Sequence, residues 1–279
     1  MRKYERAGKR DRVVKNDVSE ISENSDWIET RQLEGRKSVL EALKNDSSID
    51  RILIKKEENG DFLGTLKVIS AMAREWGIVV TGTEKTKLDY MARSGNHQGV
   101  IALCPAKDYV SVQDILDLAE EKNEPPFIIL LDGITDPHNL GAVLRTAECG
   151  GVHGVIIPKR RAAGLTGAVA RTSAGAVEYV NVAKVTNITR TIDELKKSGI
   201  WIYCADNSGN NANNIHEQDF SGSVAIIIGA EGEGVSRLVS EKADFTVSIP
   251  MLGKISSLNA SVAAGIMIYQ VVRCRYIKI

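Results

Sequence analysis

Three short stretches in the C-terminal half of this 279-residue chain combine polar side chains with glycines, which let a backbone approach a ligand closely. The first, residues 130–148, contains Asn139 and, six residues later, Arg145. Asn139 can cap the helix that follows the turn at Asp136 and Pro137, or it can hold a substrate. Arg145 can bind an anion, or it can be an ordinary surface arginine.

Glycines dominate the second stretch, residues 226–237, where Gly229, Gly232 and Gly234 surround Glu231. They permit a tight turn that brings backbone groups close to a ligand, although any turn between a strand and a helix can be rich in glycine. The stretch lacks the lysine and hydroxyl residue of a P-loop, and its spacing is not GxGxxG. Neither a P-loop nucleotide site nor a Rossmann dinucleotide site is therefore indicated.

The third stretch, residues 249–270, runs from a strand end at Pro250 through a glycine-containing loop into a long apolar helix. Ser256 or Ser257 can cap that helix, with Asn259 an incidental residue of its first turn. Each of the three stretches is ambiguous by itself. Their order and their spacing together are informative.

The elements that position these stretches follow an α/β pattern. Apolar runs predict strands at 127–131, 155–157, 201–204, 224–228 and 245–249. Several runs do not alternate with polar residues, which is typical of strands covered on both faces. Helices are predicted at 140–149 and from about Gly167, Ile188 and Leu258. The pattern predicts a mainly parallel sheet with helices on both sides and ligands at the carboxyl ends of its strands.

The N-terminal half divides into three parts. Residues 1–30 are charged and mostly basic at first, which predicts a disordered basic arm that is either a solvated tail or an RNA contact. Residues 31–105 alternate predicted helices (34–43 and 63–76) with predicted strands (49–54, 78–80 and 99–103), as in a compact α/β domain. Residues 106–126, with a helix at 112–121 and two prolines at the end, are predicted to link this domain to residues 127–279.

Composition limits the class of protein. The 36 basic and 36 acidic residues balance, so net charge gives no argument for a nucleic-acid partner. The cysteines form no CxxC pair and the histidines show no ligand spacing, which favours buried free thiols and no metal site. No apolar run approaches the ~20 residues of a membrane span, and the N-terminus lacks a signal peptide. We therefore expect a soluble cytoplasmic protein without a membrane partner.

The three stretches resemble, in order, the three motifs of the SpoU (TrmH) group of the SPOUT superfamily. NLGAVLRTAE is similar to the first motif, IGAEGEG to the second and IPMLGKISSLNASVAAGIMIYQ to the third. The N-terminal half resembles the small ribosomal-protein-like RNA-binding domain of many members, through LEGRKSVLEAL and NHQGVIAL. The resemblance covers most of residues 127–275 and is greatest to the members that methylate a guanosine ribose of 23S rRNA.

The resemblance implies a fold, a reaction and a partner. The fold is α/β, with the small RNA-binding domain followed by a trefoil-knotted SPOUT methyltransferase domain. The reaction is transfer of a methyl group from S-adenosylmethionine to a ribose 2′-hydroxyl of RNA, most specifically a guanosine of 23S rRNA. The protein is expected to be a homodimer whose active site takes residues from both protomers. The same reaction on tRNA, and a non-catalytic RNA-binding role in ribosome assembly, are the alternatives.

The resemblance also assigns residues. The expected cofactor-binding positions are Gly229, Gly232, Ile249, Pro250, Met251 and Leu258. The expected catalytic positions are Arg145, Asn139, Glu231, Ser257 and Asn259. Arg145 matches the arginine that activates the hydroxyl, but a guanidinium is a poor base, so phosphate binding and alkoxide stabilisation suit it better. RNA phosphates are expected on the basic side chains Arg36, Lys37, Lys159, Arg160, Arg161 and Arg171, because phosphate contacts supply most of the affinity for RNA.

Overall fold

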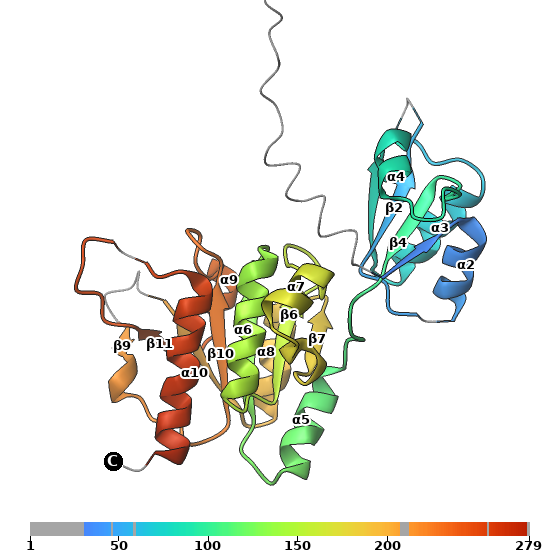
Figure 1. Ribbon diagram of the computed structural model, residues 1–279. Coiled ribbons are helices and arrows are strands. Elements are labelled where there is room, and N and C mark those ends of the chain that lie inside the picture. Colours follow the sequence, from blue (N-terminus) through green and yellow to red (C-terminus); the bar gives the residue numbers. More distant parts are fainter. Residues whose placement is uncertain (1–30, 46, 58–59, 207–211, 256, 278–279) are drawn as a thin grey trace, which may run out of the picture.

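The computed structural model describes residues 31–45, 47–57, 60–206, 212–255 and 257–277. They form two α/β units, a small one at the N-terminus and a larger one that contains the three polar stretches (Figure 1). The expected basic arm, residues 1–30, lies outside the described residues. None of the helices in the described part of the chain is long and apolar enough to cross a membrane.

The small unit is a four-stranded sheet in the order β1-β4-β2-β3. Its strands are β1 (Gln32–Glu34), β2 (Arg51–Lys55), β3 (Val79–Thr83) and β4 (Val100–Leu103), and its helices are α2 (Arg36–Lys44), α3 (Thr65–Glu75) and α4 (Lys85–Met91). Only β2 and β3 pair in parallel. Alternation along β2 separates two cores, because Ile52 and Ile54 pack with α2 and α3, whereas Leu53 packs with α4.

The larger unit contains a seven-stranded sheet in the order β7-β6-β5-β10-β8-β11-β9, and all its strand pairs are parallel. The strands are β5 (Phe127–Asp132), β6 (Gly154–Pro158), β7 (Val182–Val185), β8 (Trp201–Ala205), β9 (Asn213–Asn214), β10 (Val224–Gly229) and β11 (Phe245–Ser248). The helices are α5 (Val112–Glu121), α6 (Pro137–Cys149), α7 (Gly167–Thr172), α8 (Ile188–Lys197), α9 (Arg237–Ser240) and α10 (Ala260–Tyr276).

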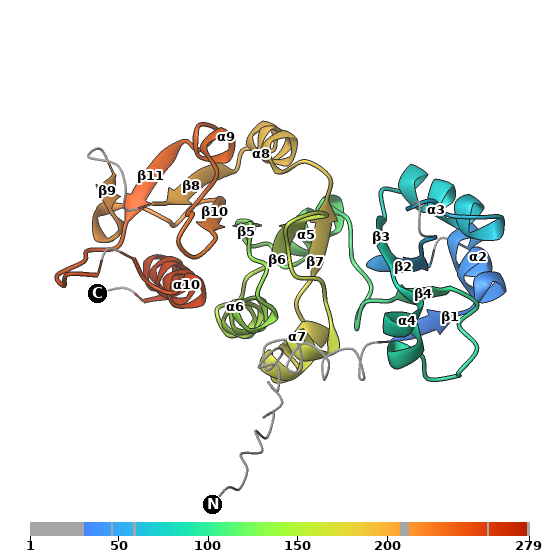
Figure 2. The ribbon, with the colours of Figure 1, turned by 90° about the horizontal axis from the view of Figure 1, so that it is seen from above.

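Helices cover both faces of this sheet (Figure 2). Ile129 and Leu131 of β5 pack into the core with α6, α7 and α10. Ile128 and Leu130 point the other way, into the core with α5, α8 and α9. The fully apolar strands therefore lie buried between two helical layers, as parallel strands usually do. The expected α/β class with a mainly parallel sheet is confirmed, and the knot stays a prediction.

Some elements differ from the expectations. Glu34 belongs to β1, because Gly35 with φ 89° separates that strand from α2. Helix α6 begins at Pro137, earlier than expected, and its N-cap is Asp136, whose carboxylate accepts from His138 N at 2.9 Å. Of the two alternatives for Asn139, capping of this helix is therefore wrong, and so is the alternative that Ser256 or Ser257 caps the last helix with Asn259 incidental. Helix α10 is capped by Asn259 and begins at Ala260.

The segment between the two units also packs. Ile115 of α5 belongs to the core of the larger unit, against Gly154, where a Cβ atom would collide with its side chain. Val110 forms a parallel bridge to Ala183, and Ala106 N donates to Leu165 O at 2.6 Å. Strands β1, β7 and β9 and helices α4 and α9 were not expected, since none of them is longer than seven residues.

Candidate active site

The loop that follows β10 folds back on itself at the carboxyl edge of the sheet. Ala230 and Gly234 exchange two backbone hydrogen bonds of 3.0 and 2.9 Å, and Gly232 and Gly234 have positive φ angles of 83° and 68°. A Cβ atom on Gly229 would collide with the backbone of Gly234 and Val235. Glycine at these positions is thus a steric requirement of the turn, which leaves Glu231 exposed at its tip.

Three polar side chains from the three sequence motifs meet beside this loop. The amide nitrogen Nδ2 of Asn259 donates to Asn139 Oδ1 at 3.0 Å and to Glu231 Oε2 at 3.2 Å. The amide oxygen of Asn259 accepts from the backbone of Ser261 at 2.9 Å, which caps α10. This double use fixes the orientation of the amide, because a flipped amide would point its oxygen at two other oxygens.

A pocket of about 350 Å³ opens between the loop after β10 and the segment that precedes α10. Its size lies in the range of small-molecule sites. Of the expected site positions, it is lined by Gly229, Glu231, Gly232, Ile249, Ser257 and Leu258. Ala205, Ile228 and Val247 add apolar surface from the ends of β8, β10 and β11. The pocket therefore combines apolar walls with exposed backbone groups of a glycine turn.

Other expected residues do not line this pocket. Pro250 and Met251 follow Ile249 in the chain but are not on the wall. Arg145 is exposed on α6 and, among the described residues, forms no hydrogen bond or ion pair. Ser256 lies outside the described residues.

The expected RNA-binding residues fall in separate places. Lys159, Arg160 and Arg161 lie in the loop after β6 and line a hollow against the small unit. Arg171 is exposed on α7, and Lys37 is exposed on α2. Arg36 is also exposed, but its Nε donates to Gln98 O at 3.0 Å, and its backbone N donates to Gln98 Oε1 at 3.2 Å. Arg36 thus has a structural partner within the small unit.

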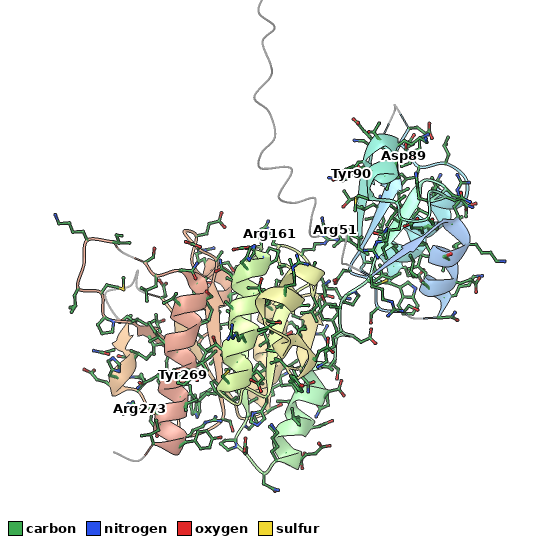
Figure 3. The ribbon with its side chains drawn as sticks, in the orientation of Figure 1. Arg51, Asp89, Tyr90, Arg161, Tyr269 and Arg273 are labelled. Carbon is green, nitrogen blue, oxygen red and sulfur yellow. The ribbon has the colours of Figure 1, made fainter. Side chains whose placement is uncertain are left out.

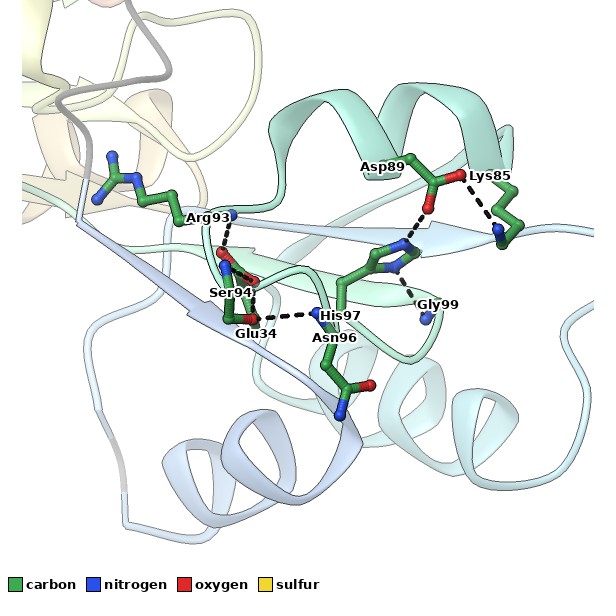
Figure 4. Close-up of polar contacts among 8 residues, drawn as sticks. All are labelled: Glu34, Lys85, Asp89, Arg93, Ser94, Asn96, His97 and Gly99. Atoms are coloured by element: carbon green, nitrogen blue, oxygen red, sulfur yellow. Dashed lines mark hydrogen bonds and ion pairs between the residues drawn. The ribbon is translucent and has the colours of Figure 1, made fainter.

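Polar contacts join residues 93–99, the segment that leads into β4, to β1 and to α4 (Figure 4). Glu34 accepts hydrogen bonds from the backbone of Arg93 at 2.7 Å and from both the backbone and the hydroxyl of Ser94. Burial of Glu34 opposes its ionisation, but these hydrogen bonds outweigh that effect and lower its pKa to about 2. His97 Nδ1 accepts from Gly99 N at 3.0 Å, so His97 Nε2 carries the proton that faces Asp89, 2.8 Å away.

Family comparisons match both units. Residues 126–269 match the SpoU rRNA Methylase family, and residues 32–110 match the RNA 2′-O ribose methyltransferase substrate binding family. A Bacillus subtilis (strain 168) protein, assigned by name to the TrmH family of tRNA/rRNA methyltransferases, is 44% identical over 241 residues, which cover 86% of this chain and 94% of the relative. A relative with a similar name from Staphylococcus aureus (strain MSSA476) is 44% identical over 253 residues, which cover 89% of this chain and 98% of the relative.

Solved structures share the fold at lower identity. The SpoU methyltransferase AviRb from Streptomyces viridochromogenes, crystallised with AdoMet, aligns with a TM-score of 0.55 and 22% identity over 91% of this chain and 98% of its own. An AdoMet-bound rRNA methyltransferase from Sinorhizobium meliloti aligns with a TM-score of 0.54 and 20% identity over 93% of this chain and 97% of its own. The two-unit α/β architecture is therefore shared with these enzymes.

Proposed function

Because the chain belongs to the SpoU (TrmH) family of RNA methyltransferases, we propose that it methylates a ribose 2′-hydroxyl of RNA, specifically of a guanosine in 23S rRNA. The observation that carries this proposal is the contact among Asn139, Glu231 and Asn259, of which Glu231 lines the pocket and the two asparagines lie behind it. It joins one side chain from each motif at one place. A merely structural role would not require a carboxylate and two amides at the edge of a ligand-sized pocket.

The methyl donor is S-adenosylmethionine, which supplies an electrophilic methyl group on a sulfonium when it is bound. The pocket fits this group. The backbone of the turn after Gly229 and the residues around Ile249 and Leu258 would hold the adenine edge through amide and carbonyl groups. Val247 and Ala260 add apolar surface for the rest of the ligand. Pro250 and Met251 complete the proposed site as neighbours of Ile249.

Asn139, Glu231 and Asn259, together called the polar trio, orient the ribose hydroxyl that accepts the methyl group. Since Asn139 Oδ1 accepts from Asn259, the Nδ2 group of Asn139 remains to donate to a ribose or phosphate oxygen. Glu231 uses Oε2 for Asn259, which leaves Oε1 to accept the proton of a ribose hydroxyl. Ser257, on the same wall, adds a further hydroxyl contact. When the cofactor is bound, the trio would hold the hydroxyl toward the methyl group, and such positioning supplies much of the rate acceleration.

Arg145 stabilises the developing alkoxide and binds the adjacent phosphate. Arg145 is six residues beyond Asn139 on α6. It is therefore displaced by about 9 Å along the helix axis and rotated about that axis by roughly two-thirds of a turn. Arg145 and Asn139 therefore do not face the same space within one chain. This separation supports a site in which Arg145 comes from a second protomer.

The proposed homodimer buries the outer face of α10. Val262, Ile266 and Tyr269 are 50%, 36% and 51% exposed, and their spacing of four and three residues places them on one side of the helix with Arg273. Figure 3 shows Tyr269 and Arg273 on this helix, which lies beside α6. An exposed apolar stripe next to the helix that carries Arg145 suits an interface between two copies.

The choice of RNA is tested by transfer of labelled methyl groups to unmodified 23S rRNA and to unmodified tRNA, assayed side by side. Label mapped to a guanosine ribose of 23S rRNA supports the proposal. The relatives' names include tRNA as well as rRNA, so tRNA is the second candidate substrate. Label on tRNA alone would keep the reaction and replace the substrate. Label on neither RNA, with intact cofactor binding, would contradict the proposal for free RNA.

A further inference from the structure

Two adjoining hollows lie between the small unit and the larger unit. One has a volume of about 390 Å³ and the other of about 290 Å³, and both are lined by Arg51, Val79 and Lys159. Arg51 begins β2 of the small unit, whereas Lys159 follows β6 of the larger unit. Figure 3 shows Arg51 and Arg161 at this junction, on the two opposite sides. We call the two hollows together the interdomain cleft.

Positive charge is concentrated in the interdomain cleft, although the whole chain has equal numbers of acidic and basic residues. Six lining cations have no acidic partner among the described residues: Arg51, Arg74, Lys87, Lys159, Arg160 and Arg161. The one acidic side chain on the described lining is Asp50, which forms an ion pair with Lys184. The remaining field of the cleft is therefore strongly positive.

The cleft has fixed walls because side chains join the two units at its base. Asp50 of the small unit accepts hydrogen bonds from Lys184 and, at 2.7 Å, from the hydroxyl of Tyr109. That hydroxyl in turn accepts from Leu165 N at 3.0 Å. The carboxyl of Asp50 and the ammonium of Lys184 are largely buried, with 12% and 15% of their side chains exposed. This contact holds the two rows of cations at a defined separation.

Two local features bring cations into the cleft from opposite walls. Lys159 reaches across to the small unit, where its Nζ would lie 3.4 Å from a Cβ atom on Gly77. Arg161 adopts a left-handed conformation with φ 56°, which is unfavourable for a residue with a side chain. The loop thus keeps an arginine at a position that glycine would occupy more easily.

We propose that the interdomain cleft binds the sugar–phosphate backbone of the substrate RNA, so that one RNA segment contacts both units at once. The inference rests on the proposed function, because it names where that substrate lies. The cleft also includes Thr135 and Pro137, which are four and two residues before Asn139, respectively. RNA in the cleft therefore extends along the carboxyl edge of the sheet toward the polar trio.

A base-stacking residue stands beside these cations. Tyr90 is 65% exposed on α4, one helical turn after Lys87, so both side chains project from the same side of the helix. Figure 3 shows Tyr90 on the side of the small unit that faces the larger unit. An exposed tyrosine next to a phosphate-binding groove is the arrangement that holds an unpaired RNA base.

Binding of labelled, unmodified 23S rRNA at several salt concentrations tests the cleft. The variant with Arg51→Gln and Arg74→Gln is expected to bind about tenfold more weakly or worse, with a salt slope reduced by about two. Lys159→Gln with Arg160→Gln on the opposite wall should do the same.

Tyr90→Ala should weaken binding about tenfold with little change in salt slope, because stacking involves no phosphate. Lys197 is exposed at the end of α8, by the opposite edge of the sheet, and Lys197→Gln is the matched control. The RNA affinity of this variant should stay within about twofold of that of the unaltered protein.

Cofactor titration and thermal melting of each variant confirm that the fold and the cofactor pocket are unchanged. Cleft variants that bind RNA as tightly as the Lys197→Gln control, while the unaltered protein methylates RNA, would overturn the cleft and leave the proposed function in place. An unaltered protein that binds the cofactor but neither binds nor methylates RNA would contradict the proposed function itself. The two failures are thus distinguishable.

Discussion

Asn259 has two tasks, and different substitutions separate them. Its oxygen caps α10, and its amide nitrogen joins Asn139 to Glu231. Asn259→Ser keeps a capping oxygen but removes the nitrogen, so the free energy of unfolding should change by less than about 1 kcal/mol. The value of kcat/KM should fall roughly a hundredfold, as expected when one oriented polar group is lost.

Asn259→Ala provides the comparison, because it removes the cap as well. It should lose a similar amount of activity. Its free energy of unfolding should fall by about 0.5–2 kcal/mol in addition. Urea unfolding and methyl transfer measured on both variants check the expectation. Near-normal turnover by Asn259→Ser would show that the amide nitrogen has no part in the reaction.

Gly229 should tolerate no side chain. A Cβ atom there would collide with the backbone of Gly234 and Val235, so Gly229→Ala must displace the turn that forms one wall of the pocket. The affinity for S-adenosylmethionine, measured by calorimetric titration, should fall at least about tenfold. Gly253→Ala, where a Cβ atom would meet nothing within 4 Å, is the matched control and should bind normally. Equal affinities for the two variants would contradict the steric argument.

The motifs identified the residues of the polar trio, but not how each is used. Asp136 and Asn139, three residues apart, can each cap a helix, and Asp136 is the cap of α6 because Pro137 fixes the first helical position. At α10 the reverse holds, since Asn259 is the cap itself. The cations of the cleft, such as Arg51 and Arg74, carry no motif. Only the fold brings them close to Lys159, and the sequence therefore could not indicate them.

At the scale of elements, Glu34 connects β1 to the loop that leads into β4 (Figure 4). Its pKa is lowered from 4.5 to about 2, so the folded state favours the charged form. The stabilisation is fully present above a pH of about 4.5 and is lost as the pH falls toward about 2. Glu34→Gln should therefore destabilise the protein near neutral pH by about 1–2 kcal/mol, after allowance for solvent screening of a partly exposed group.

Urea unfolding of both proteins at several pH values checks this expectation. The difference between the unaltered protein and Glu34→Gln should shrink as the pH falls below about 4.5. Glu41→Gln on α2 is a suitable control, because Glu41 is an exposed carboxylate whose one partner among the described residues is the exposed Lys44. A pH-independent difference would mean that Glu34 acts through shape rather than charge.

The sequence predicted the deeply buried elements best. Strands β5 and β10 are continuous apolar runs at the centre of the sheet, and the sequence predicted them within one residue at each end. Strand β7 escaped prediction because Lys184 interrupts its apolar pattern to reach Asp50. Helix α4 buries only Leu88 and Met91, too few residues to show a helical period. Short elements with only two buried apolar residues, such as β7 and α4, were thus the hardest to predict.

At the scale of the whole molecule, the separation of Arg145 from Asn139 on α6 makes a specific prediction about the dimer. Arg145→Ala alone should abolish methyl transfer while S-adenosylmethionine still binds, since Arg145 does not line the cofactor pocket of its own chain. Asn259→Ala alone should retain only about a hundredth of the normal activity. In a mixed dimer of the two variants, one site would combine the intact Arg145 of one protomer with the intact Asn259 of the other.

Random exchange of equal amounts of the two variants should therefore restore about a quarter of the normal activity, because half of the dimers are mixed and each has one complete site. Methyl transfer measured before and after subunit exchange tests this outcome. Ile266→Glu, which places a charge on the exposed stripe of α10, should prevent both dimer formation and the recovery. If exchange restores nothing although mixed dimers form, Arg145 acts within its own chain, and the separation along α6 must be closed by movement when RNA binds.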